Sequence, residues 1–325
     1  MKSPPSSLIC VSPQYRDDVY PPDLTARIAE LTNLLYAPLG PEELIKPCET
    51  LGRCQVLFAG WGMPALDQDL LDKMPQLELV LYAAGSTEHL ITPASRDRGL
   101  RVCATPDINA IPVVEYTVAQ VLFGLKLGWQ HVRTTRQTRR WERLEGIPGA
   151  FGGTVGLISL GAIGRRVADA LRSFGVKILA YDPHAAPADA EALGLTLVGL
   201  DEVFRGSHVV SVHTPLRIET RGMIQESHIR CLPQQATLIN TSRGGVIDQP
   251  GLVRTLANRP DLTAVLDVLD PEPPPRDDPI WDLDNVILTP HIAGSMGAEC
   301  KRMGEAMIDE YIRFMQEEDL WYEAK

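Results

Sequence analysis

The chain of 325 residues has few of the patterns that mark a metal centre. Its six cysteines are scattered without metal-ligand spacing and its seven histidines do not cluster, so we expect no metal site. Cysteines this sparse in a chain of this size indicate reduced, mostly buried thiols of a cytoplasmic protein. They are Cys10, Cys48, Cys54, Cys103, Cys231 and Cys300.

Positive charge is also scarce. Lysine and arginine number 31 against 42 aspartates and glutamates, which gives a net charge of −11 and a pI of 5.2. This sign argues against nucleic acid or an anionic membrane surface as a partner. We find no apolar stretch long enough to span a bilayer, and residues 1–5 (MKSPP) do not begin a signal peptide. A hydrophobic content of 44% with 22% charged residues is instead typical of a globular protein.

The order of apolar runs predicts two α/β domains, the first of them interrupted in sequence. Four short strand-like runs before residue 105 indicate a small α/β unit, and they span residues 8–11, 55–59, 77–81 and 100–103. A helix from about Pro112 to Leu127 leads into a second domain, and a helix at 297–314 returns to the first. We therefore assign 1–106 and 295–325 to one domain and 107–294 to the other. Ligands are expected in the cleft, with hinges near 106–110 and 292–295.

Three segments far apart in the chain each carry a polar residue just past a strand-like run. Arg243 follows LINTS, Asp267 follows AVL with Glu272 soon after it, and His291 follows VILTP. Parallel strands end at one edge of a sheet, where open α/β sheets bind ligands. Arginine can form two hydrogen bonds to a carboxylate, histidine can transfer a proton near neutral pH, and an acid beside histidine stabilises its charged form. The trio of Arg243, Glu272 and His291 indicates reduction of a 2-keto acid, and three unrelated strand ends are the weaker alternative.

An upstream βαβ pattern predicts a dinucleotide site. Residues 154–158 (TVGLI) are typical of a buried strand, and an amphipathic helix runs to about residue 174. A second strand ends at Asp182, 18 residues beyond Gly164 and near the offset of about 20 expected for a ribose-binding acid. Gly161 lets the backbone approach a pyrophosphate at the helix N-terminus, and Gly164 allows close packing. The cofactor-binding residues expected in this turn are Ser159, Gly161, Ala162, Ile163 and Gly164.

Asp182 decides between the two nicotinamide cofactors. Its carboxylate would accept hydrogen bonds from the ribose hydroxyls and repel a 2′-phosphate, and residues 184–186 (HAA) offer no arginine for such a phosphate. NAD is therefore expected over NADP. Ser159 departs from the fingerprint because it stands where the first glycine would be and adds a Cβ to a tight turn. We interpret it as a tolerated variation that weakens cofactor affinity.

With these motifs the chain resembles the D-isomer-specific 2-hydroxyacid dehydrogenases over almost its whole length, most strongly from about Ile108 to Gly294. Residues 211–216 (SVHTPL) resemble the family's strand and loop beside the adenine, and residues 109–115 (NAIPVVE) resemble the start of its long interdomain helix. The resemblance implies a Rossmann-type doubly wound parallel sheet that binds NAD. It also implies a smaller, flavodoxin-like α/β substrate domain.

The same resemblance implies a role for each residue of the trio. Arg243 would bind the substrate carboxylate and polarise its carbonyl, His291 would act as acid and base, and Glu272 would be its partner. Asp267 would face the nicotinamide side of the cofactor. The remaining cofactor contacts that the resemblance implies are His213, Thr214, Pro215 and Thr241.

The expected substrate contacts lie in the first domain. Trp61, in GWGMP, stands where the family places residues over the substrate tail, although a tryptophan there is as often a packing residue. The turn at Ala84, Gly85 and Ser86 corresponds to one that offers backbone N–H groups to the substrate, and a plain glycine turn is nearly as good an explanation. Trp141 lies in the segment through which the family forms homodimers, and a simple surface position is the alternative.

We expect an NAD-dependent oxidoreductase that transfers hydride between NAD(H) and a small-molecule substrate, a D-2-hydroxy acid or its 2-keto acid. Two alternatives stay open within the resemblance. The phosphite and formate dehydrogenases of the family oxidise other small anions. The C-terminal-binding-protein corepressors share the architecture and the trio but assemble on partner peptides under the control of NAD.

Overall fold

The computed structural model describes residues 4–46 and 49–324, so Cys48 and residues 1–3 lie outside the described part. The chain divides into two compact units. Unit 1 comprises Met1–Ile111 and Ser295–Lys325, and unit 2 comprises Pro112–Gly294. The first boundary falls at 111/112, where the sequence placed it at 106/107.

Unit 1 is built on a five-stranded parallel sheet with the strand order β2-β1-β3-β4-β5. This is the order of flavodoxin-like sheets, so the expected fold of the smaller domain is confirmed. The strands are β1 (Ser6–Cys10), β2 (Asn33–Leu34), β3 (Val56–Ala59), β4 (Leu79–Tyr82) and β5 (Arg101–Ala104). The helices are α1 (Arg16–Val19), α2 (Pro22–Leu31), α3 (Pro41–Leu44), α4 (Gln68–Lys73), α5 (Pro93–Asp97) and α13 (Ala298–Met315).

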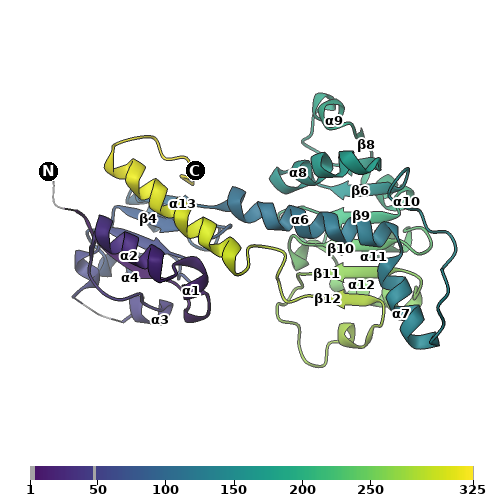
Figure 1. Cartoon of the computed structure of the whole chain (residues 1–325), viewed down its shortest axis with the longest axis horizontal. Helices are drawn as coiled ribbons and strands as arrows, with labels where there is room; N and C mark the ends of the chain where they lie inside the picture. Colours follow the sequence, from purple (N-terminus) through teal and green to yellow (C-terminus); the bar gives the residue numbers. More distant parts are fainter. Residues whose placement is uncertain (1–3, 47–48, 325) are drawn as a thin grey trace. The chain divides into compact units, whose positions relative to one another are not determined.

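Both faces of this sheet are covered, because alternate strand residues point to opposite sides. Leu8, Leu57 and Val80 enter one buried cluster, whereas Ile9 and Phe58 enter another. Helix α13, yellow in Figure 1, contributes Met303, Met307 and Tyr311 to the second cluster. The C-terminal segment therefore completes the core of the N-terminal sheet.

Unit 2 holds a seven-stranded parallel sheet with the order β12-β11-β10-β9-β6-β7-β8. Counted from β6, six of these strands have the Rossmann order 3-2-1-4-5-6, and β12 extends the sheet by one, which confirms the expected fold. The strands are β6 (Thr154–Ile158), β7 (Lys177–Tyr181), β8 (Thr196–Leu197), β9 (Val209–Val212), β10 (Thr237–Asn240), β11 (Thr263–Leu266) and β12 (Val286–Leu288). The helices are α6 (Pro106–Leu125, which begins in unit 1), α7 (Gly128–Thr138), α8 (Ala162–Leu171), α9 (Pro187–Leu193), α10 (Leu200–Gly206), α11 (Glu226–Arg230) and α12 (Gln249–Asn258).

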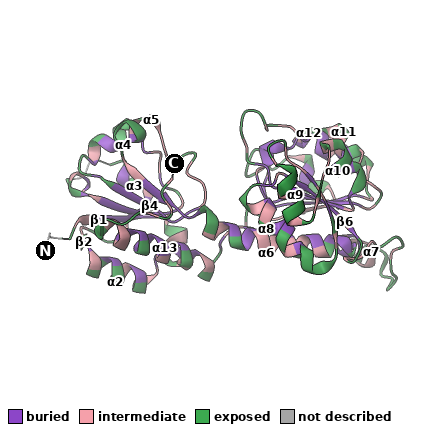
Figure 2. Cartoon of the chain, turned by 90° about the horizontal axis from the view of Figure 1, so that it is seen from above, coloured by how far each residue is buried: buried purple, intermediate pink, exposed green. Residues whose placement is uncertain are grey.

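Helices cover both faces of the second sheet, as the buried strands and exposed outer helix faces of Figure 2 illustrate. Val121 of α6 and Val167 of α8 share a cluster with Val155 and Ile239 of the strands. On the other face, Phe204 of α10 and residues of α11 and α12 pack on β9, β10 and β11. A strand buried on both sides is apolar throughout, which is why these strands were visible in the sequence.

Helix α6 differs from expectation in two ways. It begins at Pro106, six residues before the predicted start at Pro112, and Pro112 lies inside it. Pro106 takes the first-turn position that the sequence had assigned to Pro112. By length and composition alone, its 20 residues, which include an 18-residue window with a mean hydropathy of 1.4, could also cross a membrane, so the expectation that no stretch is long enough was wrong. It packs onto the second sheet through Val121 and Leu125, and 39% of that window is buried.

The cysteines in the described ranges are free, and burial dominates their chemistry. Burial raises the pKa of both Cys10 and Cys54 to about 12, so neither thiol ionises near neutral pH. Cys231 is the half-buried member of the set.

Candidate active site

The loops that carry Arg243, Asp267 and His291 follow three neighbouring strands. Strands β10, β11 and β12 are adjacent and parallel, so the segments after Asn240, Leu266 and Leu288 lie at one edge of the sheet. The three loops lie together because the C-terminal ends of parallel strands are aligned along one edge of the sheet.

His291 and Glu272 meet at this edge. The distance between His291 Nδ1 and Glu272 Oε1 is 2.6 Å, and the side chains are 48% and 41% exposed. A carboxylate only accepts, so His291 Nδ1 carries the proton of this bond and Nε2 is left for exchange with a ligand. His291 has φ +56°, in the left-handed region, a strained conformation held by two bonds from its N–H to the carbonyls of Asp267 and Thr289.

Asp267 is engaged with the loop that carries His291. Asp267 is 2% exposed, and its carboxylate accepts hydrogen bonds from Thr289 Oγ1 at 2.6 Å and from the N–H groups of Ile292 at 2.8 Å and Ala293 at 2.9 Å. A buried carboxylate requires such donors because its desolvation is costly. The observed task of Asp267 is therefore to hold this loop, and its predicted contact with the cofactor stays a prediction.

The loop that carries Arg243 is held by close backbone packing and by hydrogen bonds. A Cβ on Gly244 would lie 1.9 Å from the backbone carbon of Leu269, so no larger residue fits there. Asn240 Nδ2 donates to the carbonyl of Arg243 at 3.0 Å, and the guanidinium donates to the carbonyl of Ser242 at 2.8 Å. The half-buried guanidinium thus emerges from a rigid turn.

A cavity of about 490 Å³ opens beside the histidine within unit 2. Asp267, Glu272 and His291 line it together with apolar side chains, among them Trp281 and Leu288. A concave, mostly apolar hollow with a few convergent polar groups is the usual form of a small-molecule site.

The predicted dinucleotide turn joins β6 to α8. A Cβ on Gly164 would lie 2.1 Å from the carbonyl oxygen of Ser159, so this glycine is required for the helix to approach the strand. A Cβ on Gly161 would meet no atom within 4 Å, so protein packing does not explain that glycine. Helix α8 begins at Ala162, and the N–H groups of its first turn, which include that of Ile163, are donors of the kind that can bind an anion.

Asp182 stands at the end of β7 and reaches back to this turn. Its Oδ2 accepts from the N–H of Leu160 at 2.7 Å and from Ser159 Oγ at 3.4 Å, while Oδ1 accepts from the N–H of His184 at 2.8 Å. Ser159 has φ +78°, the conformation that favours glycine. The sequence missed Arg165, a cation near Asp182 that is paired with Asp189 at 2.8 Å.

The loop after β9 lies beside the same turn. His213 is 8% exposed, its N–H donates to the carbonyl of Ile158 at 2.8 Å, and its Nε2 has no protein partner in the described chain. Thr214 is buried, whereas Pro215 is exposed and its carbonyl accepts from Thr220 Oγ1. Open space at Gly161, a free helix N-terminus, Asp182 and the unpaired Nε2 together fit a dinucleotide.

The burial of His213 predicts pH-dependent stability. Desolvation lowers the pKa of His213 from 6.5 to about 4. At a pH between these two values, the residue is protonated in the unfolded chain and neutral in the folded chain. The free energy of unfolding should fall by about 3 kcal/mol from this residue as the pH drops from 7 to 4. Urea unfolding of wild type and His213→Gln across this range checks it, because the variant should lose that part of the slope. Equal slopes would contradict a buried neutral imidazole.

Ser159→Gly should tighten NADH binding by a factor of about two to five, equivalent to less than about 1 kcal/mol. Glycine adopts φ +78° without strain and frees Asp182 from the serine hydroxyl. Strain relief of about 1 kcal/mol is offset by the flexibility of glycine in the unfolded chain, so stability should change by less than about 1 kcal/mol. Titration calorimetry with NADH measures the effect. Loss of binding would show that the hydroxyl contacts the ligand.

The expected substrate residues of unit 1 have mixed surroundings. Trp61 is partly buried, packs against both cores of this unit and lies 5.1 Å from the ring of Tyr15, as a packing residue would. Ala84 is buried and its N–H donates to the carbonyl of Tyr82 at 2.8 Å, so that donor is already engaged. Gly85 and Ser86 are half-buried, and a Cβ on Gly85 would lie 3.0 Å from Asn109 Nδ2.

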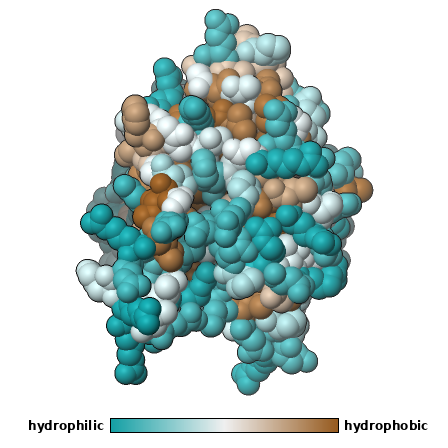
Figure 3. Space-filling model, turned by 90° about the vertical axis from the view of Figure 1, so that its right-hand side faces the viewer, coloured by the Kyte–Doolittle hydropathy of each residue, from teal (hydrophilic) through white to brown (hydrophobic). Residues whose placement is uncertain are grey.

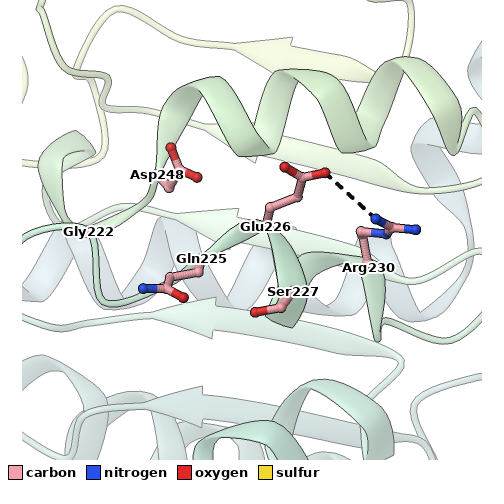
Figure 4. Close-up of a pocket in the computed structure, with 6 residues that line it drawn as sticks. All are labelled: Gly222, Gln225, Glu226, Ser227, Arg230 and Asp248. Atoms are coloured by element: carbon pink, nitrogen blue, oxygen red, sulfur yellow. Dashed lines mark ion pairs between the residues drawn. The ribbon is translucent and has the colours of Figure 1, made fainter.

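A separate hollow of about 530 Å³ lies in unit 2, and Figure 4 shows its lining. Glu226 pairs there with Arg230 at 3.9 Å and with Arg254, at 2.8 Å. Its other lining residues are Gly222, Gln225, Ser227 and Asp248. It includes no predicted site residue. In the described ranges, no group of three or more histidines, cysteines and acids could hold a metal ion.

Comparison with known proteins agrees with this geometry. Residues 120–293 match the family described as D-isomer specific 2-hydroxyacid dehydrogenase, NAD binding domain. The chain is 34% identical over 246 residues to a glyoxylate reductase of Thermofilum pendens, covering 74% of this chain and 72% of that protein.

Two further similarities qualify the comparison. The chain is 31% identical over 276 residues to a D-3-phosphoglycerate dehydrogenase of Methanocaldococcus jannaschii, covering 85% of this chain and 52% of that protein. It thus spans about half the length of this relative. The structure of a D-lactate dehydrogenase of Aquifex aeolicus, complexed with NAD and lactic acid, is similar with a TM-score of 0.72 and 25% identity, over 96% of both chains.

Proposed function

The chain belongs to the D-isomer-specific 2-hydroxyacid dehydrogenase family, and from that membership we propose that it interconverts a D-2-hydroxy acid and its 2-keto acid with NAD(H). Residues 120–293 form the NAD-binding domain of this family. The observation that carries the proposal is the 2.6 Å contact between His291 and Glu272, at the sheet edge that also bears Arg243.

His291 is the proposed proton donor in reduction. Bound NADH supplies the hydride. The imidazolium passes its Nε2 proton to the carbonyl oxygen of the substrate, and in oxidation the neutral ring takes the proton back. Glu272 supports the charged ring through Nδ1, because a carboxylate 2.6 Å away stabilises imidazolium.

Arg243 is the proposed binding group for the substrate carboxylate. Its planar guanidinium can form two parallel hydrogen bonds to a carboxylate and can stabilise charge that develops on the reacting oxygen. The N–H groups of Gly85 and Ser86 are proposed as further carboxylate donors. Ala84 is proposed as the neighbouring residue of that substrate-binding turn, and Trp61 is proposed to lie over the substrate tail.

The cofactor would be held by the residues of the dinucleotide turn and its neighbours. The first turn of α8 would bind the pyrophosphate and Asp182 the adenosine ribose. Thr241 and Asp267 are the proposed contacts on the nicotinamide side, and His213, Thr214 and Pro215 those beside the adenine.

We expect wild-type enzyme to use NADH with a higher kcat/KM than NADPH, because Asp182 would repel a 2′-phosphate. Asp182→Ala should narrow that ratio, mainly by weakening NADH binding. Asp182→Asn is the matched control, since it removes the charge but keeps an acceptor for the N–H groups of Leu160 and His184. Steady-state kinetics with both cofactors measure the ratio. Equal use of NADPH by the wild type would overturn the assignment.

We also propose a homodimer formed through residues 128–152. Trp141 is 96% exposed, Phe151 90% and Val132 51%, and exposed apolar side chains of this kind are candidates for a protein interface. On the face seen in Figure 3, apolar patches are separated by hydrophilic surface. Sedimentation of wild type and Trp141→Ala tests the proposal. The wild type should sediment as a dimer, and the variant dimer should have a higher dissociation constant.

We propose a cytoplasmic location, which the free thiols support.

A further inference from the structure

Two neighbouring hydroxyl residues of α6 contact both candidate catalytic loops. The hydroxyl of Tyr116 lies 3.0 Å from Thr289 Oγ1, two residues before His291. The hydroxyl of Thr117 lies 3.0 Å from Thr241 Oγ1, two residues before Arg243. One helical segment therefore reaches the loop of the proton donor and the loop of the carboxylate-binding arginine.

The direction of the Tyr116 hydrogen bond can be deduced. Thr289 Oγ1 has one proton, which it donates to the carboxylate of Asp267 at 2.6 Å. Its lone pairs are then left for the neighbour at 3.0 Å, so Tyr116 must be the donor. Burial raises the pKa of the Tyr116 hydroxyl, and it therefore remains protonated throughout the neutral range.

The chain of hydrogen bonds ends on the backbone around His291. Tyr116 donates to Thr289, Thr289 donates to Asp267, and Asp267 accepts the N–H groups on the far side of His291, those of Ile292 and Ala293. His291 itself is in the left-handed region, where a histidine requires outside support. Linked hydrogen bonds of this kind strengthen one another in a buried site.

Thr117 is fully buried, and its partner Thr241 is 8% exposed. Gly124, two turns further along α6, allows the helix to lie close to the sheet, because a Cβ there would lie 3.1 Å from Val209 Cγ2 and 3.3 Å from Thr237 Cβ. The helix is thus a rigid support packed closely on β9 and β10, and the two hydroxyls extend this support to the loops.

We propose that Tyr116 and Thr117 are positioning residues, Tyr116 for His291 and Thr117 for Arg243. The proposal rests on the proposed function, in which His291 and Arg243 act on the substrate. It adds that Tyr116 affects proton transfer through His291, whereas Thr117 affects binding of the keto acid through Arg243.

Tyr116→Phe removes one hydroxyl and keeps the ring. We expect kcat for keto-acid reduction to fall roughly 3- to 10-fold, the effect of one hydrogen bond, with the KM of the keto acid within about twofold of wild type. The alkaline limb of the rate profile should move to lower pH, because a displaced His291 bonds less well to Glu272. Tyr36→Phe, at a tyrosine 60% exposed in unit 1, is the control and should match wild type.

Thr117→Val should show the opposite split, with a KM raised roughly 3- to 10-fold and a smaller change in kcat. Thr117→Ser keeps the hydroxyl and should restore KM. In a double-mutant cycle, Tyr116→Phe and Thr289→Val should be non-additive, because each breaks the same bond. Effects that simply multiply, or a Tyr116→Phe variant with wild-type kcat and pH profile, would overturn the proposal.

Amide hydrogen exchange keeps the inference separate from the proposed function. Residues 289–293 should exchange faster in Tyr116→Phe than in wild type, whether or not any keto acid is turned over. If the wild type reduces no keto acid, the proposed function fails, and exchange in this segment still decides the positioning role. Unchanged exchange there would reject it.

Discussion

His291→Ala is expected to lower kcat for keto-acid reduction by roughly 10²–10⁴-fold, the usual contribution of a general acid. Alanine removes the only group proposed to protonate the carbonyl oxygen. NADH affinity should stay within about twofold, because the dinucleotide turn between β6 and α8 is intact. Stopped-flow kinetics and NADH titration measure the two quantities.

Two companions sharpen this test. His228→Gln changes a histidine outside the candidate site and should leave the rate unchanged. Glu272→Gln should move the alkaline limb of the rate profile to lower pH, because an amide supports imidazolium less well than the carboxylate now 2.6 Å from Nδ1. A near-normal rate for His291→Ala would refute the acid–base assignment.

Arg243→Ala should lower kcat/KM for the keto acid by roughly 10²–10³-fold, the effect of losing a preorganised donor at a developing charge. The substrate carboxylate would lose its two hydrogen bonds to the guanidinium, and the reacting oxygen would lose its stabilising cation. Steady-state kinetics over a range of keto-acid concentrations separate the contributions of KM and kcat.

Arg243→Lys is the informative intermediate, because it keeps the charge and loses the bidentate geometry. Its kcat/KM should lie between those of wild type and Arg243→Ala. Arg302→Ala, at an exposed arginine of α13, is the control for loss of one positive charge and should be neutral. Equal activity of Arg243→Ala and wild type would remove Arg243 from the mechanism.

The fold could be predicted where the signal was local. Strand β6 was predicted with its observed bounds, because a buried strand and the glycines after it are consecutive in sequence. Helix α13 was predicted within a residue at each end from its helical spacing. Strands β2 and β8 have two residues each, too few for an alternating pattern, and were missed.

The candidate site was predictable only in part. Arg243, Glu272 and His291 could be found because each follows a strong strand pattern. The use of the Asp267 carboxylate could not, because it depends on N–H groups 25 and 26 residues away in sequence. The contact between Tyr116 and Thr289 spans 173 residues and leaves no local trace. The segment that resembles the family's interdomain helix, residues 109–115, ends one residue before Tyr116.

The most direct test is a screen of purified wild-type protein against a panel of 2-keto acids, followed by loss of NADH absorbance and by chiral analysis of the product. Our account predicts that at least one 2-keto acid is reduced, that the product has the D configuration and that NADH is used in preference to NADPH. A protein that binds NADH firmly, reduces none of them and instead captures a partner peptide would contradict the account and favour a corepressor-like role.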